Sequence, residues 1–471
     1  MNERMQVLDQ SELTRIHDAT LAVFRETGVR FQDEEAVEIF KRHGVKTDQD
    51  VVFIDSKTLE SALESAPSQF TLEGREPSKS VTIGGDHMAL APGYGSCHIL
   101  SASGEMRDPT CEDYDNFCKL VHTSDILNMN GCLMVDPRDI DPLTSHRYMI
   151  RSNILLCDKP FFGSSVSREA ARDSFHMAGM AWGGSDQLKD KAVMIAIINS
   201  LSPLQYSSEM AGAIIEYAKN GQANMLGGMV MAGATGPVQL PGTVVLQNAE
   251  FLSGVVLAQL TRPGAPCVYG GTSTITDMRT GLPLVGAPEQ MILQNAQAQV
   301  AKYYNLPCRG SGGISDGFIP DGQAAMESSM ALMNTLRSGS NFIIQSAGIL
   351  SAYLMMSYEK FIMDEEILAR ILRMFKPLDF SDEQINLETI RSVGIGNEYL
   401  THPTTFKHFK KEYYVSGLTR RQSHDAWVNS GKKAIHEVAT QKVAERIGAY
   451  EKPDISPEIE ADLNQYAGLK N

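Results

Sequence analysis

The sequence offers little that would place the chain in a membrane or outside the cell. Its first residues, MNERMQVLDQSE, lack the basic and apolar regions of a signal peptide. No window holds the ~18 uninterrupted apolar residues that a transmembrane helix needs. We therefore expect a cytoplasmic protein that makes no contact with a membrane.

Positive charge is also scarce. The chain has 42 basic against 57 acidic residues, a net charge of -15. Such a balance works against binding to phosphate backbones, so we expect no nucleic-acid partner.

The cysteines show no pattern of a disulfide framework or of a zinc finger. Their number is odd and no CxxC pair occurs. They are Cys97, Cys111, Cys118, Cys132, Cys157, Cys267 and Cys308. We interpret them as buried reduced thiols and predict no bound metal, because free cysteine is among the most buried residue types. A zinc site collected from distant residues stays open, with Cys97 beside His98 as its weak sign.

Length and composition favour one large globular core. The chain has 471 residues, of which 42% are hydrophobic and 21% are charged. It shows no internal repeat, no low-complexity tract and no long Pro/Gly-rich linker. This length suits a barrel of about 250 residues with an extension at each end.

From residue 88 onward, short apolar runs alternate with longer amphipathic stretches, which is typical of βα units. The runs are 88–94, 126–134, 160–166, 192–200, 223–230, 265–271, 306–313 and 340–348. Helices are predicted between them, for example over 111–124, 208–221, 244–260 and 288–304. Eight units without a GxGxxG turn favour an α/β fold of the (β/α)8 TIM-barrel type over an open doubly wound sheet.

We divide the chain at 1–87, 88–375 and 376–471. The first part is predicted as a helical extension with a small β element, QFTLEG and VTIGG, and with helices near 13–24, 33–43 and 55–65. Asp55 is placed to cap the third helix. The last part is predicted to be helical, with a capping box in SDEQ at 381–384 and a polar helix around 421–447. It packs on the barrel or in the interface of a homo-oligomer.

Barrel enzymes carry their chemistry at the carboxyl ends of the strands. The predicted strands end in amides, hydroxyls, thioethers, an aromatic ring and one cation. These residues are Tyr94, Met134, Asp136, Ser164, Ser165, Asn199, Ser200, Met229, Met231, Thr272, Thr274, Arg309, Ser311, Gln345 and Ser346. A hydrolase or an aldolase would need a lysine, a histidine or a carboxylate pair there.

Arg309 is the strongest single indication of a binding site in the sequence. A guanidinium directly after an apolar strand and inside a Gly/Ser-rich loop is costly unless it binds an anion. A ligand carboxylate is one interpretation, and a structural salt bridge to Asp316 or Asp321 is the other.

Tyr94 and His402 carry weaker signals. Tyr94 lies between glycines in APGYGS, where its ring either faces a bound cation or packs as a structural aromatic. His402 is the best of the dispersed histidines, and a hydrogen-bonded structural role is its more natural interpretation.

Three segments resemble the trimethylamine methyltransferase family of corrinoid-dependent enzymes. They are GGTSTITDMRTG (270–281), LPCRGSGGISDGFIPDGQAAMES (306–328) and NEYLTHPTT (397–405). The resemblance extends over nearly the whole chain. It implies a TIM barrel whose mouth is met by a separate corrinoid protein, with cobalt in the Co(I) state as methyl acceptor and no cofactor held by this chain.

The trimethylamine enzymes themselves carry pyrrolysine, whereas this chain has Gly317-Phe318 near the corresponding place. In this respect it resembles the branch that acts on quaternary amines such as glycine betaine, proline betaine, carnitine and γ-butyrobetaine. The resemblance then implies that Tyr94 faces the cation, that Arg309 binds the carboxylate and that Gln345 adds a hydrogen bond. Thr272 and Ser311 complete the expected substrate site.

The resemblance implies proline betaine or glycine betaine as the substrate. Glycine betaine members of the family tend to have histidine near the position of Gln345, so glutamine here favours a bulkier betaine such as proline betaine. Trimethylamine is predicted to be a poor substrate because it offers no carboxylate. Two other interpretations are a lyase-type barrel enzyme with an inward acid or base, and a betaine-binding protein without catalysis.

Overall fold

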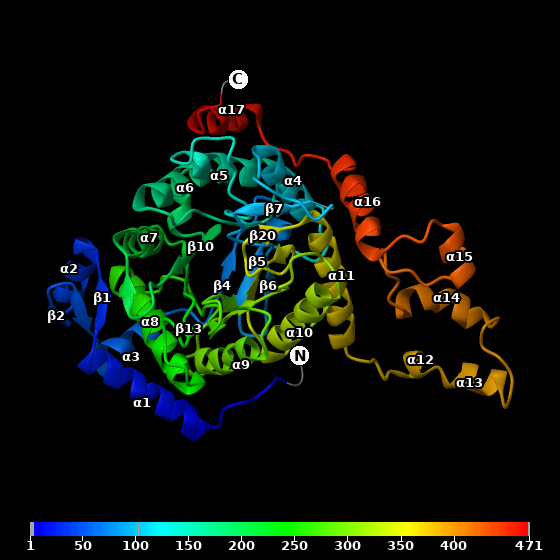
Figure 1. Ribbon diagram of the computed structural model, residues 1–471, viewed down its shortest axis with the longest axis horizontal. Coiled ribbons are helices and arrows are strands. Elements are labelled where there is room, and N and C mark those ends of the chain that lie inside the picture. The colour runs from blue at the N-terminus through cyan, green and yellow to red at the C-terminus, as the bar shows by residue number, and fades with distance from the viewer. Residues whose placement is uncertain (1–3, 102, 470–471) are drawn as a thin grey trace.

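The computed structural model describes residues 4–101 and 103–469 and shows an α/β fold (Figure 1). The N-terminal part has helices α1 (Gln10–Glu26), α2 (Glu34–Arg42) and α3 (Ser56–Ser65). Strands β1 (Val29–Phe31), β2 (Lys46–Asp48) and β3 (Val51–Phe53) lie among them, followed by the antiparallel pair β4 (Gln69–Leu72) and β5 (Val81–Gly84), with the 3-10 turn η1 (Pro77–Lys79) between. The predicted helices and the small β element are confirmed.

Local signals explain where these N-terminal elements begin and end. The Asp55 side chain accepts a hydrogen bond from the backbone N–H of Thr58 and so caps α3, as predicted. Gly28 follows α1 with a φ of 74°, a left-handed conformation that glycine adopts without steric cost.

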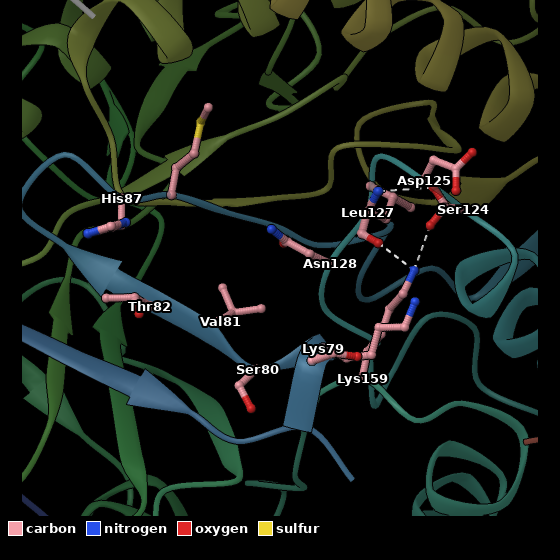
Figure 2. A pocket seen from close by; sticks show the side chains of 12 residues that line it. Lys79, Ser80, Val81, Thr82, His87, Ser124, Asp125, Leu127, Asn128 and Lys159 are labelled. Atoms are coloured by element: carbon pink, nitrogen blue, oxygen red, sulfur yellow. Dashed lines mark hydrogen bonds between the residues drawn. The ribbon is translucent and has the colours of Figure 1, made fainter. Parts of the chain in front are cut away.

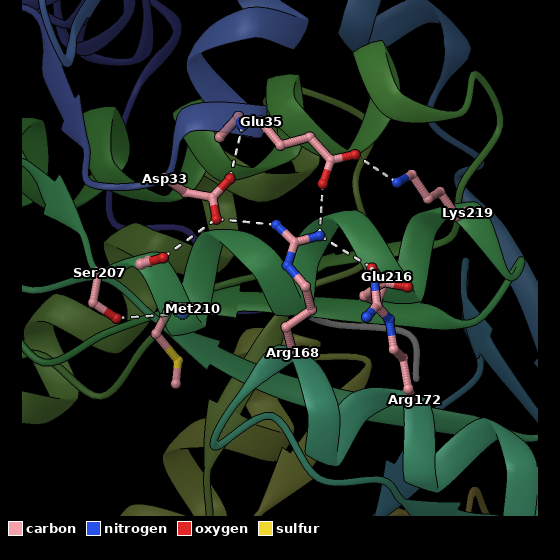
Figure 3. Close-up of polar contacts among 10 residues, drawn as sticks. Asp33, Glu35, Arg168, Arg172, Ser207, Met210, Glu216 and Lys219 are labelled. Atoms are coloured by element: carbon pink, nitrogen blue, oxygen red, sulfur yellow. Dashed lines mark hydrogen bonds and ion pairs between the residues drawn. The ribbon is translucent and has the colours of Figure 1, made fainter.

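The N-terminal part is attached to the rest of the molecule by an ionic cluster around Arg168 (Figure 3). Its guanidinium donates to Asp33 at 3.0 Å, to Glu35 at 2.7 Å and to Glu216 at 3.0 Å. Arg168 opens helix α6 (Arg168–Ala181), and Glu216 lies in α7 (Ser208–Lys219). One cation therefore links the start of helix α2 in the N-terminal part to two helices of the central body.

Seven short parallel strands form the centre. They are β6 (Ala89–Leu90), β9 (Phe161–Phe162), β10 (Met194–Asn199), β12 (Ala223–Gly227), β14 (Cys267–Tyr269), β17 (Arg309–Ser311) and β18 (Phe342–Ile344). The pairs β9-β10-β12-β14 and β17-β18-β6 are all parallel. A parallel bridge between Tyr269 and Cys308 joins the two groups. Each strand lies inside an apolar run that the sequence predicted as a strand.

The predicted strand at 126–134 is wrong as a regular strand. This segment makes an isolated bridge from Asn130 to Phe161, and the N–H groups of Asn128 and Met129 donate to the carbonyl of Leu90. The Asn128 side chain in turn accepts from the N–H of Leu90 at 2.7 Å. A side-chain amide thus takes a place that a backbone carbonyl has in a regular ladder.

Helices surround these strands on the outside (Figure 1). Besides α6 and α7 they are α4 (Cys111–His122), α5 (Ser145–Leu156), α8 (Leu240–Thr261), α9 (Pro288–Tyr303), α10 (Gly322–Ser338) and α11 (Tyr358–Phe375). The helices predicted over 111–124, 208–221, 244–260 and 288–304 are confirmed. Helix α8 is long and apolar enough to cross a membrane, but 83% of its most apolar window is buried inside the protein, as expected of a core helix.

The loops that follow the main strands contain small sheets. One contains β7 (His98–Leu100), β8 (Met106–Arg107), β19 (Ile349–Leu350) and β20 (Met355–Met356), and another contains β13 (Met231–Ala232), β15 (Thr274–Thr276) and β16 (Pro283–Leu284). Strand β11 (Gln205–Tyr206) pairs with β1 of the N-terminal part, and a short 3-10 turn, η2 (Gln187–Lys189), precedes β10. These pairs give the loops at the carboxyl ends of the strands a defined shape.

The C-terminal part is helical in the residues that the structure describes. Its helices are α12 (Asp382–Ile385), α13 (Leu387–Val393), α14 (Pro403–Glu412), α15 (His424–Asn429), α16 (Ile435–Gly448) and α17 (Pro457–Tyr466). The capping box at 381–384 is wrong, because Ser381 precedes α12 but makes no side-chain cap. The single helix around 421–447 is also wrong, because α15 ends at Asn429 and a turn containing Gly431 precedes α16.

Candidate substrate site

Arg309 lies at the start of β17, and its side chain is only 3% exposed. One terminal nitrogen donates to Oε1 of Gln345 at 3.4 Å, and the buried Nε has no hydrogen-bond partner. Among residues 4–101 and 103–469, no carboxylate lies within 4.0 Å of the guanidinium. The guanidinium therefore has hydrogen-bonding capacity that the described part of the chain leaves unused.

Glycine provides the space for this side chain. A Cβ added at Gly227 would lie 3.2 Å from a terminal nitrogen of Arg309 and 2.5 Å from the carbonyl oxygen of Gly270. Gly270 itself has a φ of 131°. The ends of β12 and β14 thus approach the guanidinium closely because they lack side chains there.

Burial lowers the pKa of Arg309 to about 10, while the neighbouring Tyr353 and Tyr94 hydroxyls act in the opposite direction. The cause is the loss of water around the cation, which disfavours the charged form. At neutral pH the guanidinium still carries its charge.

The structural salt bridge considered for Arg309 is wrong. Asp316 accepts hydrogen bonds from the backbone N–H groups of Val285 and Gly286, at 3.0 and 2.8 Å. Asp321 caps helix α10. Both carboxylates shape loops instead of neutralising Arg309.

The charged residues of the motifs that carried the family resemblance also shape loops and do not pair with Arg309. Glu327 accepts from the Ser315 hydroxyl at 2.6 Å and from the N–H of Asp316 at 2.8 Å. In DMRTG, Asp277 holds a turn, and the Arg279 side chain that pairs with it is 89% exposed. These residues fix the loops after β14 and β17, and none of them pairs with the guanidinium of Arg309.

Gln345 directly follows β18 and is 5% exposed. Its φ of 56° is left-handed, and its N–H donates to the carbonyl of Pro92 at 3.0 Å. This backbone conformation turns the chain at the strand end, and the side chain reaches Arg309.

Tyr94 belongs to the loop after β6 and is half-buried. Its ring centroid lies 5.8 Å from that of Phe162. Burial raises the pKa of its hydroxyl, the Cys132 thiol adds to this, and the positive charge of Arg309 opposes it. The tyrosine thus lies close enough to Arg309 to sense its charge.

Tyr353 is a residue of this region that sequence reasoning missed. Its hydroxyl is buried and has no hydrogen-bond partner, as is also true of the Ser311 hydroxyl. Burial raises the pKa of Tyr353, whereas the Thr272 hydroxyl, the Arg309 charge and the Ser311 hydroxyl lower it. Tyr353 therefore brings the predicted residues Thr272, Arg309 and Ser311 into one neighbourhood.

The backbone around Tyr353 is unusual. Ser351, Ala352 and Tyr353 have φ values of 52°, 51° and 77°, each in the left-handed region that non-glycine residues rarely adopt. The N–H of Ser351 donates to Gly317 and that of Ala352 to Ser315, at 2.9 and 3.0 Å. The loop after β18 is thus held by the loop after β17, and this contact directs Tyr353 toward Arg309.

Behind these loops lies a buried ion pair. Lys360 and Asp364 of α11 are both fully buried, and Nζ lies 2.6 Å from the carboxylate. Nζ also donates to the Gly313 carbonyl, and Asp364 accepts from the N–H of Gly348. The pair therefore connects the ends of β17 and β18 from the helix side.

A separate cavity of about 470 Å³ lies at the opposite ends of the strands (Figure 2). Its lining includes Met88, directly before β6, Asn128, the first residue of the 128–130 segment, and Lys159, shortly before β9. The Lys159 ammonium donates to the carbonyls of Val121, Ser124 and Leu127 at 2.7 Å each. We interpret this cation as a structural tie for the end of α4.

His122, Cys157 and Asp158 form the one group of potential metal ligands found in the described residues. Burial raises the pKa of the Cys157 thiol to about 11, with Lys159 and Arg75 nearby. Two positive side chains this close to the group oppose the binding of a metal cation. Cys97 and His98 form no such group, and all seven cysteines are free.

His402 acts as predicted for a structural histidine. It precedes α14, and its Nδ1 accepts from the N–H of Thr404 at 3.3 Å.

Comparison with known proteins assigns the chain to a family. The trimethylamine methyltransferase (MTTB) family matches residues 1–471. The chain belongs to the trimethylamine methyltransferase family. A glycine betaine methyltransferase of Desulfitobacterium hafniense (strain Y51) is 40% identical over 98% of this chain and 96% of its own length. A proline betaine:corrinoid methyltransferase of Eubacterium limosum is 33% identical over 96% and 95%.

A comparison with solved structures supports the α/β fold of the chain. The crystal structure of the Methanosarcina barkeri monomethylamine methyltransferase (MtmB) matches with a TM-score of 0.51 at 11% identity, covering 92% of this chain and 98% of that one. Family membership thus confirms the resemblance seen in the three sequence segments.

Proposed function

We propose that the chain transfers a methyl group from a small carboxylate-bearing quaternary amine, such as proline betaine or glycine betaine, to the Co(I) of a separate corrinoid protein. The observation that carries the proposal is Arg309, a buried guanidinium without a carboxylate partner in the described residues. A ligand carboxylate would supply the missing charge through two parallel hydrogen bonds. The names of the two relatives, which denote carboxylate-bearing quaternary amines, support this substrate class.

We also propose that the parallel strands close into a (β/α)8 barrel over 88–375, flanked by extensions 1–87 and 376–471. Support comes from the order of the pairs, which runs from β6 through 128–130, β9, β10, β12, β14, β17 and β18 and returns to β6. In such a barrel, Gln345 and the loop with Tyr353 lie at the carboxyl ends of the strands, where barrel enzymes bind substrate. Arg309 is the first residue of β17, and its side chain reaches Gln345 at that end.

In this proposal Arg309 and Gln345 bind the carboxylate, and the hydroxyls of Thr272, Ser311 and Tyr353 lie beside them. The rings of Tyr94 and Tyr353 offer faces to the quaternary ammonium. A partner's corrinoid supplies, as Co(I), the electron pair that accepts the methyl group, while the N–C bond pair stays on nitrogen. The leaving group is a neutral tertiary amine, so no side chain needs to protonate it.

Catalysis by the chain's own residues is then a matter of orientation and exclusion of water. Effective molarities for aligned reactants correspond to about 7 to 11 kcal/mol. We propose that the chain itself holds no metal or organic cofactor.

The loops after the strands offer a surface for the corrinoid protein. Each carries a large apolar side chain that is at least 44% exposed. These rim residues are Met106, Leu143, Val166, Leu201, Val238, Met278, Phe318 and Leu354. Because parallel strands end at one edge, the rim residues surround the same end as Arg309, and a ring of exposed apolar groups is typical of a protein-binding surface.

The alternatives fit less well. A lyase would need a free acid or base near the site, but Asp316, Glu327 and Asp364 are all engaged by backbone N–H groups. A binding protein without catalysis would not need an apolar rim around its site.

The test uses free Co(I) cobalamin as acceptor and follows its visible absorption with glycine betaine, proline betaine, carnitine and trimethylamine as substrates. We expect demethylation of a betaine, with proline betaine preferred because Gln345 stands where glycine betaine enzymes tend to have histidine, and little turnover of trimethylamine. Equal turnover of trimethylamine would contradict the role of Arg309.

A second test separates docking from chemistry. Phe318→Ser, at 71% exposure, is expected to slow transfer to the corrinoid protein but not to free cobalamin. The control is Ile292→Ser on α9, a residue that is 53% exposed and outside the rim. Equal loss with both acceptors would exclude Phe318 from docking.

A further inference from the structure

Residues 376–434 form an arm that projects from the side of the molecule. The arm leaves the body where α11 ends at Phe375 and returns where α16 begins at Ile435. Figure 1 shows α12, α13, α14 and α15 extending away from the ring of helices, in yellow-orange to orange.

The arm exposes apolar side chains at unusual density. Of 29 large hydrophobic residues exposed in the described residues, 12 lie in this segment. They are Leu378, Phe380, Ile385, Leu387, Ile390, Ile395, Tyr399, Leu400, Phe406, Tyr413, Val415 and Val428. Within 376–434, all of it described, only Val393 and Leu418 are buried. Helices of ten residues or fewer are marginal in water without packing, so the arm lacks a core of its own.

Six of these twelve side chains line a groove of about 1250 Å³. Leu378, Phe380, Ile385 and Leu387 lie on one side, and Tyr399 and Tyr413 belong to the flanks of α14. A soluble protein rarely exposes a large apolar surface unless another surface covers it.

The charge of the arm indicates what covers it. The arm as a whole contains nine basic and seven acidic residues, and the basic excess lies in its second half. Residues 403–434 contain seven basic residues, Lys407, Lys410, Lys411, Arg420, Arg421, Lys432 and Lys433, against the acidic Glu412 and Asp425, whereas 376–402 contain two basic and five acidic residues. The whole chain has a net charge of -15, so the remainder is strongly acidic. The basic, apolar half of the arm, 403–434, is complementary in charge to the acidic body of another copy of the same chain.

The position of the arm separates it from the proposed corrinoid surface. Helix α11 begins directly after the loop of Tyr353 and runs for 18 residues, or roughly 27 Å, away from the strand ends. The arm contacts α11 from its middle to its far end: Tyr414 donates to Glu366 at 2.9 Å, and Arg373, near the end of the helix, donates to the Glu412 carbonyl at 2.8 Å. A corrinoid protein must reach Arg309, at the other end.

We propose that the arm binds the body of a second copy of this chain. Its apolar residues supply the buried contact and its basic residues select the acidic body. Since each copy carries both the arm and the body, two copies can exchange arms around a twofold axis.

The first measurement is the mass of the wild-type chain alone by sedimentation velocity. The chain mass is 51.6 kDa, and we expect a species of at least twice that mass at micromolar concentration. A monomer under these conditions would overturn the proposal, as would association only after the corrinoid protein is added.

The second measurement locates the contact. Leu400→Glu combined with Phe406→Glu replaces side chains that are 73% and 66% exposed, and it should weaken self-association by roughly a hundredfold or more. Ile292→Glu on α9, 53% exposed, is the matched control and should keep the wild-type mass. An arm variant with the wild-type mass would overturn the proposal.

A charge variant gives an independent result if the apolar variant fails to fold, which far-UV circular dichroism would reveal. Lys410→Glu with Lys411→Glu is expected to weaken association at low salt, and the difference from wild type should shrink as salt rises. Unchanged association at low salt would show that the acidic body is not the partner of the arm.

Discussion

Arg309 and Lys360 are both buried cations near the ends of β17 and β18, but their surroundings differ. Lys360 has a carboxylate at 2.6 Å, a carbonyl and a hydroxyl, so every donor of its ammonium is used. Arg309 has a neutral glutamine at 3.4 Å and an unpartnered Nε. The donors of Lys360 are all used within the chain, whereas the guanidinium of Arg309 keeps hydrogen-bonding capacity that we propose is used by the carboxylate of the substrate.

This difference assigns separate roles to two charges of the same sign. A paired buried charge holds parts of the fold together. Its removal leaves the partner charge buried without compensation, which lowers the free energy of unfolding. An unpaired buried charge makes the free protein less stable and is retained where it serves binding. Substitution at the two positions should therefore have opposite consequences for stability and for substrate affinity.

The largest expected effect is a loss of stability in Lys360→Met. Asp364 would remain fully buried without its partner, which typically costs about 3 to 5 kcal/mol of unfolding free energy. Thermal and urea unfolding measure this. The control is Lys442→Met, which removes an equally short but exposed pair with Glu445 and should change stability by less than about 1 kcal/mol. Equal effects would show that the buried pair is not a structural tie.

The next effect is a loss of betaine affinity in Arg309→Ala without a loss of stability. Truncating one partner of a buried charged contact typically costs about 2 to 5 kcal/mol, so kcat/KM should fall on the order of 30-fold or more. Arg309→Lys should recover part of the loss, because lysine offers a point charge in place of a planar fork. Titration calorimetry and melting curves measure both properties.

Arg279→Ala is the control for this variant, because the Arg279 side chain on the neighbouring loop is 89% exposed. It should leave affinity for the betaine nearly unchanged. A destabilised Arg309→Ala protein with unchanged affinity would place Arg309 in the same class as Lys360.

A smaller effect is expected from Tyr353→Phe. The loss of one hydroxyl beside the carboxylate removes a hydrogen bond of about 0.5 to 1.5 kcal/mol, which corresponds to a roughly two- to twelvefold weaker affinity. Tyr303→Phe on the surface of α9 is the control. An unchanged affinity would remove the hydroxyl of Tyr353 from the site, leaving the ring as its only contact.

The smallest effect is the dependence of affinity on alkaline pH. Arg309 is charged below its pKa of about 10, so affinity should stay constant to pH 9 and fall as the guanidinium loses its proton. At pH 10.5 the charged fraction predicts about fourfold weaker binding. Titrations at both pH values, each with a melting curve, measure this. Constant affinity would show that the guanidinium does not bind the carboxylate through its charge.

Much of the fold followed from hydrophobic pattern. Parallel strands buried on both faces have short apolar runs, and seven of the eight predicted runs contain a strand. The run at 126–134 failed because Asn128 and Asn130 bond to nearby backbone, a competition that an apolar count does not register. The turn inside 421–447 was missed because helical periodicity dominated over a single Gly431.

The site was predictable only in part. Arg309, Gln345, Thr272 and Ser311 were predicted as candidates because they lie at or near the ends of apolar runs, and parallel strands end at one edge. Tyr353 was not found, because its placement depends on left-handed φ values at three residues that are not glycine or asparagine. The remote partners of Asp316 and Glu327 were equally hidden, since long-range hydrogen bonds leave no local signature.

The left-handed run at Ser351–Tyr353 has a consequence for engineering. The aim of the tyrosine is set by backbone dihedral angles that the loops after β17 and β18 impose together, so a rotamer change alone cannot redirect it. Point substitutions at 353 should therefore tune how tightly a given amine is held, while a change of amine should require grafting both loops as one module from a donor protein.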